Sequence, residues 1–213
     1  VLRKAFLILR DEESEALALQ LGAIPTRTFL GVDPVFSLRC LSPQRGVYSG
    51  KLAVFLRSVD REKEEALFLA LQALRAQGVE MELAAFHRKL DESVVERLAR
   101  RLGVPGIFFT DAEEVFRYFE TVEMVFSLRL HPLILSTLRG IPWVALNVDP
   151  KIAALSSFFD QKNLLFWENL SPQALLALYG KKEELRKRTE AVRELFRKRE
   201  ETMPEYLRAL LLR

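Results

Sequence analysis

The strongest constraint on the fold is an alternation of short, mostly apolar segments with longer amphipathic ones between Lys51 and Gly180. The apolar segments read KLAVFL, VEMELAAF, GIFF, EMVFSL, WVALN and LLFW. Strands that are apolar on both faces are typical of a parallel sheet covered by helices on both sides. The intervening segments have helical spacing and acceptors at their starts, with Asp91, Asp111 and Ser171 as predicted caps. The sequence therefore predicts a doubly wound α/β domain over residues 51–180, which binds its ligand at the carboxyl ends of the strands.

The segments on either side differ from this domain. Residues 1–45 contain an apolar stretch, AFLIL, then a helical segment and a second short strand. We expect them to be the end of an N-terminal α/β domain, most of which lies outside this sequence. Residues 181–213 predict one long helix, a break at Pro204 and a short tail helix. Packing of this extension against the domain is favoured over a partner-binding or membrane-surface helix.

Composition excludes several classes of protein. The chain has 213 residues, a net charge of +3, two histidines and one cysteine. A charge of this size does not predict nucleic-acid binding, and no apolar run is long enough for a membrane span. No signal peptide is visible, and the single cysteine fits a reducing compartment, so we expect a cytoplasmic location. The motifs GxGxxG, GxxxxGK, HExxH and GxSxG are all absent, which argues against a classical dinucleotide enzyme, a metalloenzyme and a serine hydrolase. No metal site is predicted.

The segment SLRLHPLILS places Arg129 and His131 in an apolar run, at the carboxyl end of one predicted strand and the start of a helix. Lys151 occupies the same position after the next strand. Two cations, an imidazole and two helix starts at one sheet edge favour an anionic ligand such as a phosphate or carboxylate. The structural alternative, which the spacing leaves open, is that Arg129 pairs with a carboxylate such as Asp149 and that His131 is an ordinary loop residue.

Three further residues end predicted strands in the same way. They are Arg10, Arg57 and His87. Taken alone, each fits an ordinary surface or structural role better. Their shared topological position makes them candidate ligand-binding residues.

Several of these segments resemble one enzyme family. The combination SLRLHPLIL…RGIPWVALNVDPK resembles the signature of polysaccharide pyruvyl transferases, a group of bacterial cell-wall enzymes. The segments LRDEES, GVDPVF, VFLR and AAFHRKLD resemble further blocks of that family, in the same order. The resemblance extends from Leu9 to about Phe159.

The resemblance implies a two-domain protein of the GT-B type that transfers the carbon skeleton of phosphoenolpyruvate onto two hydroxyls of a sugar, giving a pyruvate ketal and phosphate. Phosphoenolpyruvate is then the donor substrate, no cofactor is needed, and the acceptor is a sugar or lipid-linked glycan of a cell-surface polysaccharide, of the kind that anchors surface-layer proteins. A homodimer is left open. The implied catalytic residues are His131, Arg129 and Lys151. The implied substrate-binding residues are Arg10, Arg57, Leu130, Ser127, Asp149 and His87.

Two departures from the family pattern affect these expectations. Val148 stands where the family usually has an aromatic residue, which removes one sugar-stacking position. The Gly-rich block of the family's first domain is absent from this sequence, so half of the acceptor site should be missing and the chain alone should be nearly inactive.

Two other readings remain. A nucleotide-sugar glycosyltransferase or epimerase of the same fold would bind a nucleotide diphosphate at this edge. Such enzymes usually carry a ribose-binding Glu at the corresponding helix start, whereas HPLILSTLRG has no acidic residue. A truncated, non-catalytic module that only binds a partner is the third reading.

Overall fold

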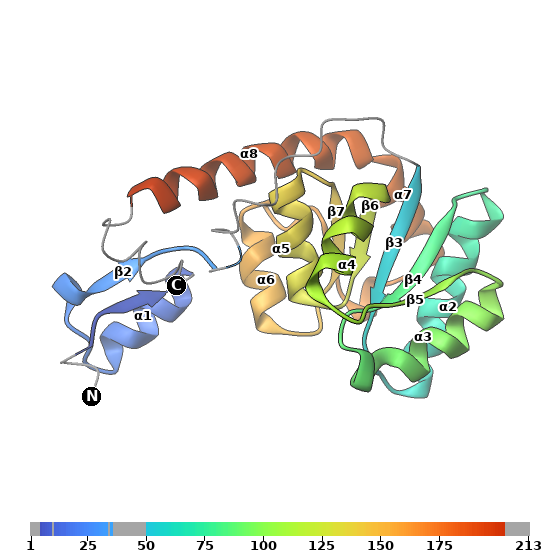
Figure 1. Cartoon of the computed structure of the whole chain (residues 1–213), viewed down its shortest axis with the longest axis horizontal. Helices are drawn as coiled ribbons and strands as arrows, with labels where there is room; N and C mark the ends of the chain where they lie inside the picture. Colours follow the sequence, from blue (N-terminus) through green and yellow to red (C-terminus); the bar gives the residue numbers. More distant parts are fainter. Residues whose placement is uncertain (1–4, 10, 34, 36–49, 203–213) are drawn as a thin grey trace. The chain divides into compact units, whose positions relative to one another are not determined.

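The computed structural model in Figure 1 describes residues 5–9, 11–33, 35 and 50–202. Its contacts divide the chain into two compact units, one formed by residues 1–41 with 191–213 and the other by residues 42–190. The domain boundaries predicted from the sequence, at 45–51 and 180–181, remain predictions.

The smaller unit contains a parallel pair of short strands. Between the strands, the acidic first turn of a helix is capped by Asp11, whose side chain accepts a hydrogen bond from the Ser14 N–H at 2.7 Å. The elements are β1 (Leu7–Leu9), α1 (Glu12–Gln20), a 3-10 turn (Pro25–Arg27) and β2 (Thr28–Leu30).

The larger unit is built on six strands that pair in the order β5-β4-β3-β6-β7-β8. Every pairing in this sheet is parallel. The strands are β3 (Lys51–Leu56), β4 (Met81–Ala85), β5 (Gly106–Phe108), β6 (Val122–Ser127), β7 (Trp143–Leu146) and β8 (Leu164–Leu165).

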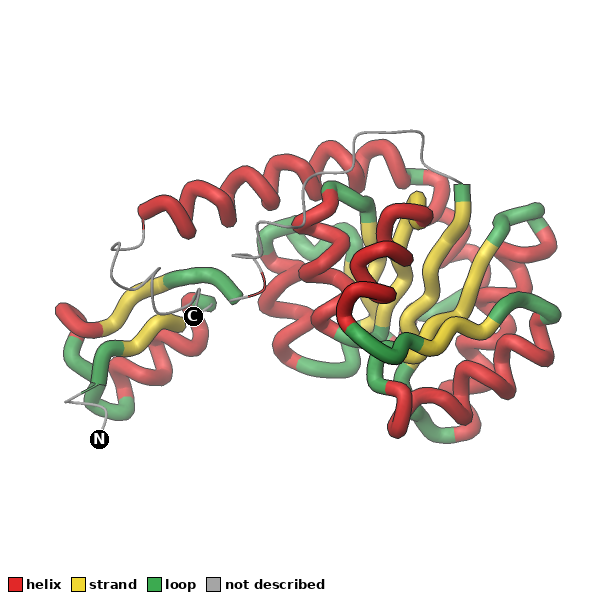
Figure 2. The backbone as a smooth tube through the Cα atoms, in the orientation of Figure 1, coloured by secondary structure: helices red, strands yellow, loops and turns green. Residues whose placement is uncertain are grey.

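Helices connect these strands and lie on both sides of the sheet (Figures 1 and 2). The connecting helices are α2 (Arg61–Ala76), α3 (Arg88–Leu102), α4 (Ala112–Tyr118), α5 (Leu130–Arg139) and α6 (Pro150–Ser157). After β8 come α7 (Pro172–Gly180) and α8 (Lys182–Thr202), and 3-10 turns lie at Phe119–Thr121 and Trp167–Asn169.

Alternate residues of each strand supply two separate cores. Leu52, Val54 and Leu56 of β3 pack in one cluster with buried residues of α2, α3 and α7. Phe55 points to the other side, where its ring contacts those of Phe119 and other aromatic residues. Because both faces are buried, the strands are mostly apolar, with the polar residues Lys51, Glu82, Glu123 and Ser127 as exceptions. The doubly wound α/β sheet predicted from sequence is confirmed.

Most helix starts lie where the sequence predicts them. The side chains of Asp111 and Ser171 accept hydrogen bonds from backbone N–H groups of the first turns of α4 and α7. Asp91, however, is not the cap of α3. That helix begins at Arg88 with His87 as its N-cap, and Asp91 is a fully buried residue at its fourth position. The break predicted at Pro204 lies outside the described residues.

Among the described helices, none is both long and apolar enough to cross a membrane.

Candidate active site

The strand order reverses direction between β3 and β6. The chain proceeds from β3 outward to β4 and β5, then returns to β6 on the other side of β3. Such a switch point opens a crevice at the carboxyl ends of the two strands and is where doubly wound folds bind ligands. Phe55 is paired with Ser127 and Leu56 with Ala85, so the strands end level with one another. Arg57 and Arg129 therefore flank the switch point.

Arg129 is the N-cap of α5, and its guanidinium pairs with a buried carboxylate. Its Nη2 lies 2.5 Å from Asp91 Oδ1 and its Nε lies 3.1 Å from Asp91 Oδ2. The Asp91 side chain is fully buried, whereas 23% of the Arg129 side chain is exposed. The carboxylate partner that the structural alternative required therefore exists, but it is Asp91 of α3 rather than Asp149.

Ser127 and Leu130 shape the turn around Arg129. The Ser127 hydroxyl accepts a hydrogen bond from the Arg129 N–H at 2.9 Å and donates one to the Arg129 carbonyl at 2.8 Å. Ser127 is fully buried, and Leu130 is the half-buried first residue of α5. Their substrate-binding roles remain predictions; the contacts described here fix the backbone of Arg129.

His131 is the second residue of α5, at the same junction, and is exposed. Its ring stacks on Phe86, with 6.1 Å between centroids and 11° between planes. Neither ring nitrogen has a hydrogen-bond partner among the described residues. Phe86 directly follows β4, so this contact joins the ends of β4 and β6 across the end of β3.

The end of β7 brings three more polar residues to the same edge. Asp149 caps α6 by accepting a hydrogen bond from the Lys151 N–H at 2.9 Å. Lys151 is exposed in the first turn of α6, and within the described part of the chain its ammonium has no ion-pair partner. The side-chain Oδ1 of Asn147 is buried without a hydrogen bond.

Arg57 and His87 complete the set of described candidates. Arg57 is half-buried after β3, and no hydrogen bond or ion pair joins its guanidinium to the described residues. His87 is exposed, and its backbone N–H donates to Asp91 Oδ2 at 3.3 Å. Arg10 lies outside the described residues. A half-buried guanidinium without a carboxylate partner leaves its charge available to an anion.

The sequence interpretation missed the roles of Asp91 and Phe86. Asp91 is spaced three, four and seven residues before Val94, Val95 and Leu98, which are all buried. That spacing places its carboxylate on the apolar stripe of α3, and an acid on such a stripe needs a cationic partner. This signal was present in the sequence.

Comparison with known proteins assigns the chain to a family. The family model for polysaccharide pyruvyl transferases matches residues 1–150, which is more than half of the sequence. The chain belongs to the polysaccharide pyruvyl transferase family. The match includes the segments that contain Arg57, His87, Arg129 and His131. No protein with a curated description matches the sequence.

Solved structures similar to this pyruvyl transferase family member share its fold at low sequence identity. A structure described as a UDP-N-acetylglucosamine 2-epimerase from Listeria monocytogenes has a TM-score of 0.62 at 17% identity, covering 85% of this chain and 52% of its own. The MnaA–UDP structure from S. aureus has a TM-score of 0.63 at 10% identity, covering 87% and 53%. The pneumococcal O-GlcNAc transferase GtfA, solved with UDP and GlcNAc, has a TM-score of 0.59 at 10% identity, covering 96% and 45%.

These likenesses concern the fold alone, and they confirm the GT-B-like architecture predicted from sequence. The chain spans about half the length of the first two structures.

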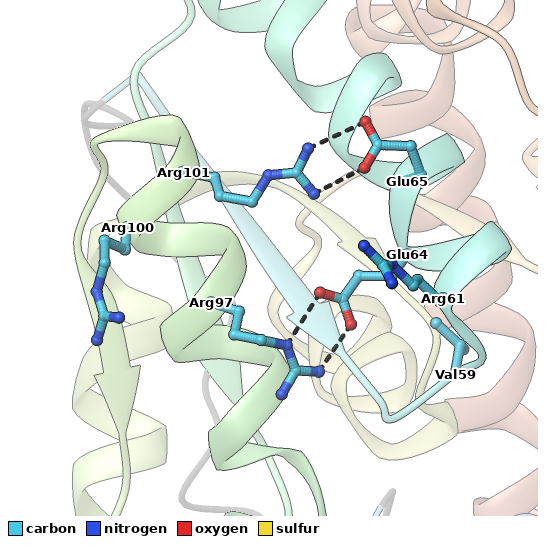
Figure 3. Close-up of a pocket in the computed structure, with 7 residues that line it drawn as sticks. All are labelled: Val59, Arg61, Glu64, Glu65, Arg97, Arg100 and Arg101. Carbon is cyan, nitrogen blue, oxygen red and sulfur yellow. Dashed lines mark hydrogen bonds and ion pairs between the residues drawn. The ribbon is translucent and has the colours of Figure 1, made fainter.

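The structure also has a charged groove between α2 and α3 (Figure 3). Its volume is about 700 Å³. Arg97 makes a two-point contact with Glu64, at 3.1 and 2.7 Å, and Arg101 does the same with Glu65, at 3.0 and 2.8 Å. The hydrogen bond to Arg101 lowers the pKa of the Glu65 carboxyl. Figure 3 shows Arg100 pointing away from both pairs, so the groove does not gather free cations around one point. The two ion pairs link α2 to α3.

We expect the Glu64–Arg97 pair to stabilise the fold only modestly. A double-mutant cycle with Glu64→Gln and Arg97→Gln should give a coupling free energy of about 0.3–1 kcal/mol, because 51% of the Arg97 side chain is exposed. Urea unfolding at low and high salt measures it, and the coupling should shrink at 1 M salt. A coupling above about 2 kcal/mol that salt leaves unchanged would contradict this view of the groove.

For metal binding, the described residues offer no group of three His, Cys, Asp or Glu side chains that could hold an ion.

Proposed function

We propose that this chain forms the phosphoenolpyruvate-binding part of a polysaccharide pyruvyl transferase. The observation that carries the proposal is the junction of β6 and α5. In a chain of this family, Arg129 and His131 lie there beside the switch point of the sheet, with other cationic side chains at neighbouring strand ends.

The charge at this edge suits a ligand with two anionic groups. Phosphoenolpyruvate carries a carboxylate and a phosphate and needs several donors placed around it. Arg57 and Lys151 have no carboxylate partner among the described residues, and Arg129 has free N–H groups beyond its pair with Asp91. The N-terminus of α5 adds backbone N–H groups and a favourable dipole. At α6 only the dipole contributes, because Pro150 has no N–H and the N–H groups of Lys151 and Ile152 already bond to Asp149. These features support binding of such a dianion.

The proposed reaction needs one group that gives and takes a proton. Protonation of the phosphoenolpyruvate methylene makes it a methyl group and leaves an oxocarbenium-like carbon, to which an acceptor hydroxyl adds with loss of its proton. Phosphate then leaves and a second hydroxyl adds, so that one hydroxyl proton ends on the methyl carbon and the other on phosphate. An imidazole suits this transfer near neutral pH. His131 is exposed at the site, and its ring plane is held against Phe86.

The cations would act on the leaving group. Negative charge accumulates on the phosphate as its bond to carbon breaks. Donors held in place beforehand stabilise that charge without reorganising during the reaction. We assign this role to Arg129 and Lys151, with Arg57 available for the carboxylate.

The test is release of inorganic phosphate from phosphoenolpyruvate by the whole protein, with a panel of sugar acceptors that includes a β-linked N-acetylmannosamine glycan. We expect phosphate release that depends on the acceptor, and a product heavier by one pyruvate ketal in mass spectrometry. If the whole protein binds UDP and not phosphoenolpyruvate, and turns over nucleotide sugars instead, the proposal is wrong.

A further inference from the structure

Within the described part of the chain, the carboxylate of Asp91 accepts three hydrogen bonds, and all of them come from groups at the candidate site. Oδ1 accepts from Arg129 Nη2 at 2.5 Å, and Oδ2 accepts from Arg129 Nε at 3.1 Å. Oδ2 also accepts from the backbone N–H of His87 at 3.3 Å. Asp91 is fully buried, and it lies 38 residues from Arg129 in the sequence. A buried carboxylate in this position therefore joins the ends of β4 and β6.

This pairing uses one edge of the Arg129 guanidinium and leaves the other free. The group has five N–H donors, of which Asp91 takes one from Nε and one from Nη2. The remaining three, on Nη1 and Nη2, have no partner among the described residues. Part of the side chain is exposed, so these donors can reach a ligand. Two adjacent guanidinium nitrogens match the two oxygens of a carboxylate or phosphate.

We propose that Asp91 is a positioning residue, which holds Arg129 by its Nε–Nη2 edge so that the Nη1–Nη2 edge faces the anionic substrate. The proposal deepens the function proposed above and rests on it. Neither the Ser127 turn nor helix α5 fixes the long side chain of Arg129, since they contact only its backbone. Asp91 is the described group that restrains the guanidinium itself.

Two other roles for Asp91 are possible, and each predicts a different effect of its replacement on stability or anion binding. A residue that only stabilises the fold would, when replaced, lower the melting temperature and leave binding by the folded protein unchanged. A residue that only neutralises Arg129 would, when replaced, tighten anion binding because a repulsive charge is gone. If Asp91 positions Arg129, its replacement should instead weaken anion binding. We expect positioning to dominate because solvent at the exposed side of Arg129 screens the repulsion, whereas a displacement of about 1 Å can cost about 100-fold.

The experiment is calorimetric titration of phosphoenolpyruvate, and separately of inorganic phosphate, into the wild-type chain and four variants. These are Asp91→Asn, Arg129→Lys, the double variant of both, and Glu92→Gln. Asp91→Asn keeps the shape and removes the two-point contact, and it should weaken phosphoenolpyruvate binding about 10- to 100-fold. In the Arg129→Lys background the same change should alter affinity by no more than about twofold, because Asp91 acts through Arg129. Glu92→Gln removes an equal charge one residue along, at a carboxylate that is 38% exposed, and should leave affinity within about twofold.

The outcomes separate this inference from the proposed function. If phosphoenolpyruvate binds and Asp91→Asn leaves affinity unchanged or tightens it, the positioning role is wrong and the proposed function stands. If the wild type binds inorganic phosphate but not phosphoenolpyruvate, and the coupling between Asp91 and Arg129 holds for phosphate, the proposed function is wrong and the positioning role stands. If the wild type binds neither anion, both are wrong. Should Asp91→Asn melt below the assay temperature, the titrations are repeated at a temperature where circular dichroism shows it folded.

Discussion

Replacing His131 with glutamine should lower turnover of the whole protein in the proposed reaction by about 10²–10⁴-fold, the usual contribution of one acid–base group. Glutamine keeps the size and some hydrogen bonding of histidine but cannot exchange a proton near neutral pH. The affinity for phosphoenolpyruvate should change much less, because the charge of the anion is met by arginine and lysine side chains. Steady-state phosphate release gives the turnover, and calorimetric titration gives the affinity.

Arg129→Lys is the contrasting variant for this experiment. A lysine ammonium is a point charge and cannot form a two-point contact, so this change should weaken binding of phosphoenolpyruvate more than His131→Gln does. Thermal melting of both variants is the control. If His131→Gln leaves turnover unchanged, or acts only by unfolding the domain, His131 is a packing residue whose stacking on Phe86 is its whole role.

Replacing Phe55 with alanine should lower the free energy of unfolding by about 3–5 kcal/mol, the range for loss of a large aromatic residue from a core. Phe55 is fully buried in the central strand β3. Its ring lies 5.5 Å from that of Phe119 and about 6 Å from three others, those of Phe86, Phe109 and Tyr118. An alanine would leave a cavity that these rings cannot fill without moving. Urea unfolding followed by circular dichroism measures the change.

Leu69→Ala is the matched control for this prediction. Leu69 is 49% exposed on α2, so removing its side chain should change stability by no more than about 0.5 kcal/mol. Phe86 contacts both Phe55 and His131, so Phe55→Ala should also disturb the site in protein that remains folded. A loss of less than about 1 kcal/mol for Phe55→Ala would mean that the aromatic cluster is loosely packed and does not support the site.

Much of the fold could be predicted because strands and helix caps depend on residues that are close together in the sequence. A strand buried on both faces is mostly apolar, and β3 and β7 lie within predicted segments, while β6 begins one residue before its predicted segment. Caps at Asp111 and Ser171 could be predicted because an acceptor of this kind bonds to an N–H three residues away. The candidate site edge followed from the same pattern, since residues after parallel strands meet at one edge.

The sequence by itself determined the parallel sheet, most helix starts, and the placement of Arg57, Arg129, His131 and Lys151 at strand-to-helix junctions, because each depends on neighbours within a few positions. Only the tertiary structure decided which of these side chains are held and which are free. Whether Arg129 pairs with Asp149 or with Asp91 depends on how α3 lies against the end of β6. Asp91 is 38 residues from Arg129 in the sequence, so no local pattern reveals this pairing. The local pattern at Asp91 resembled a cap because a carboxylate near a helix start is favourable in either role. The buried environment, which makes an unpaired carboxylate costly, selected the ion pair.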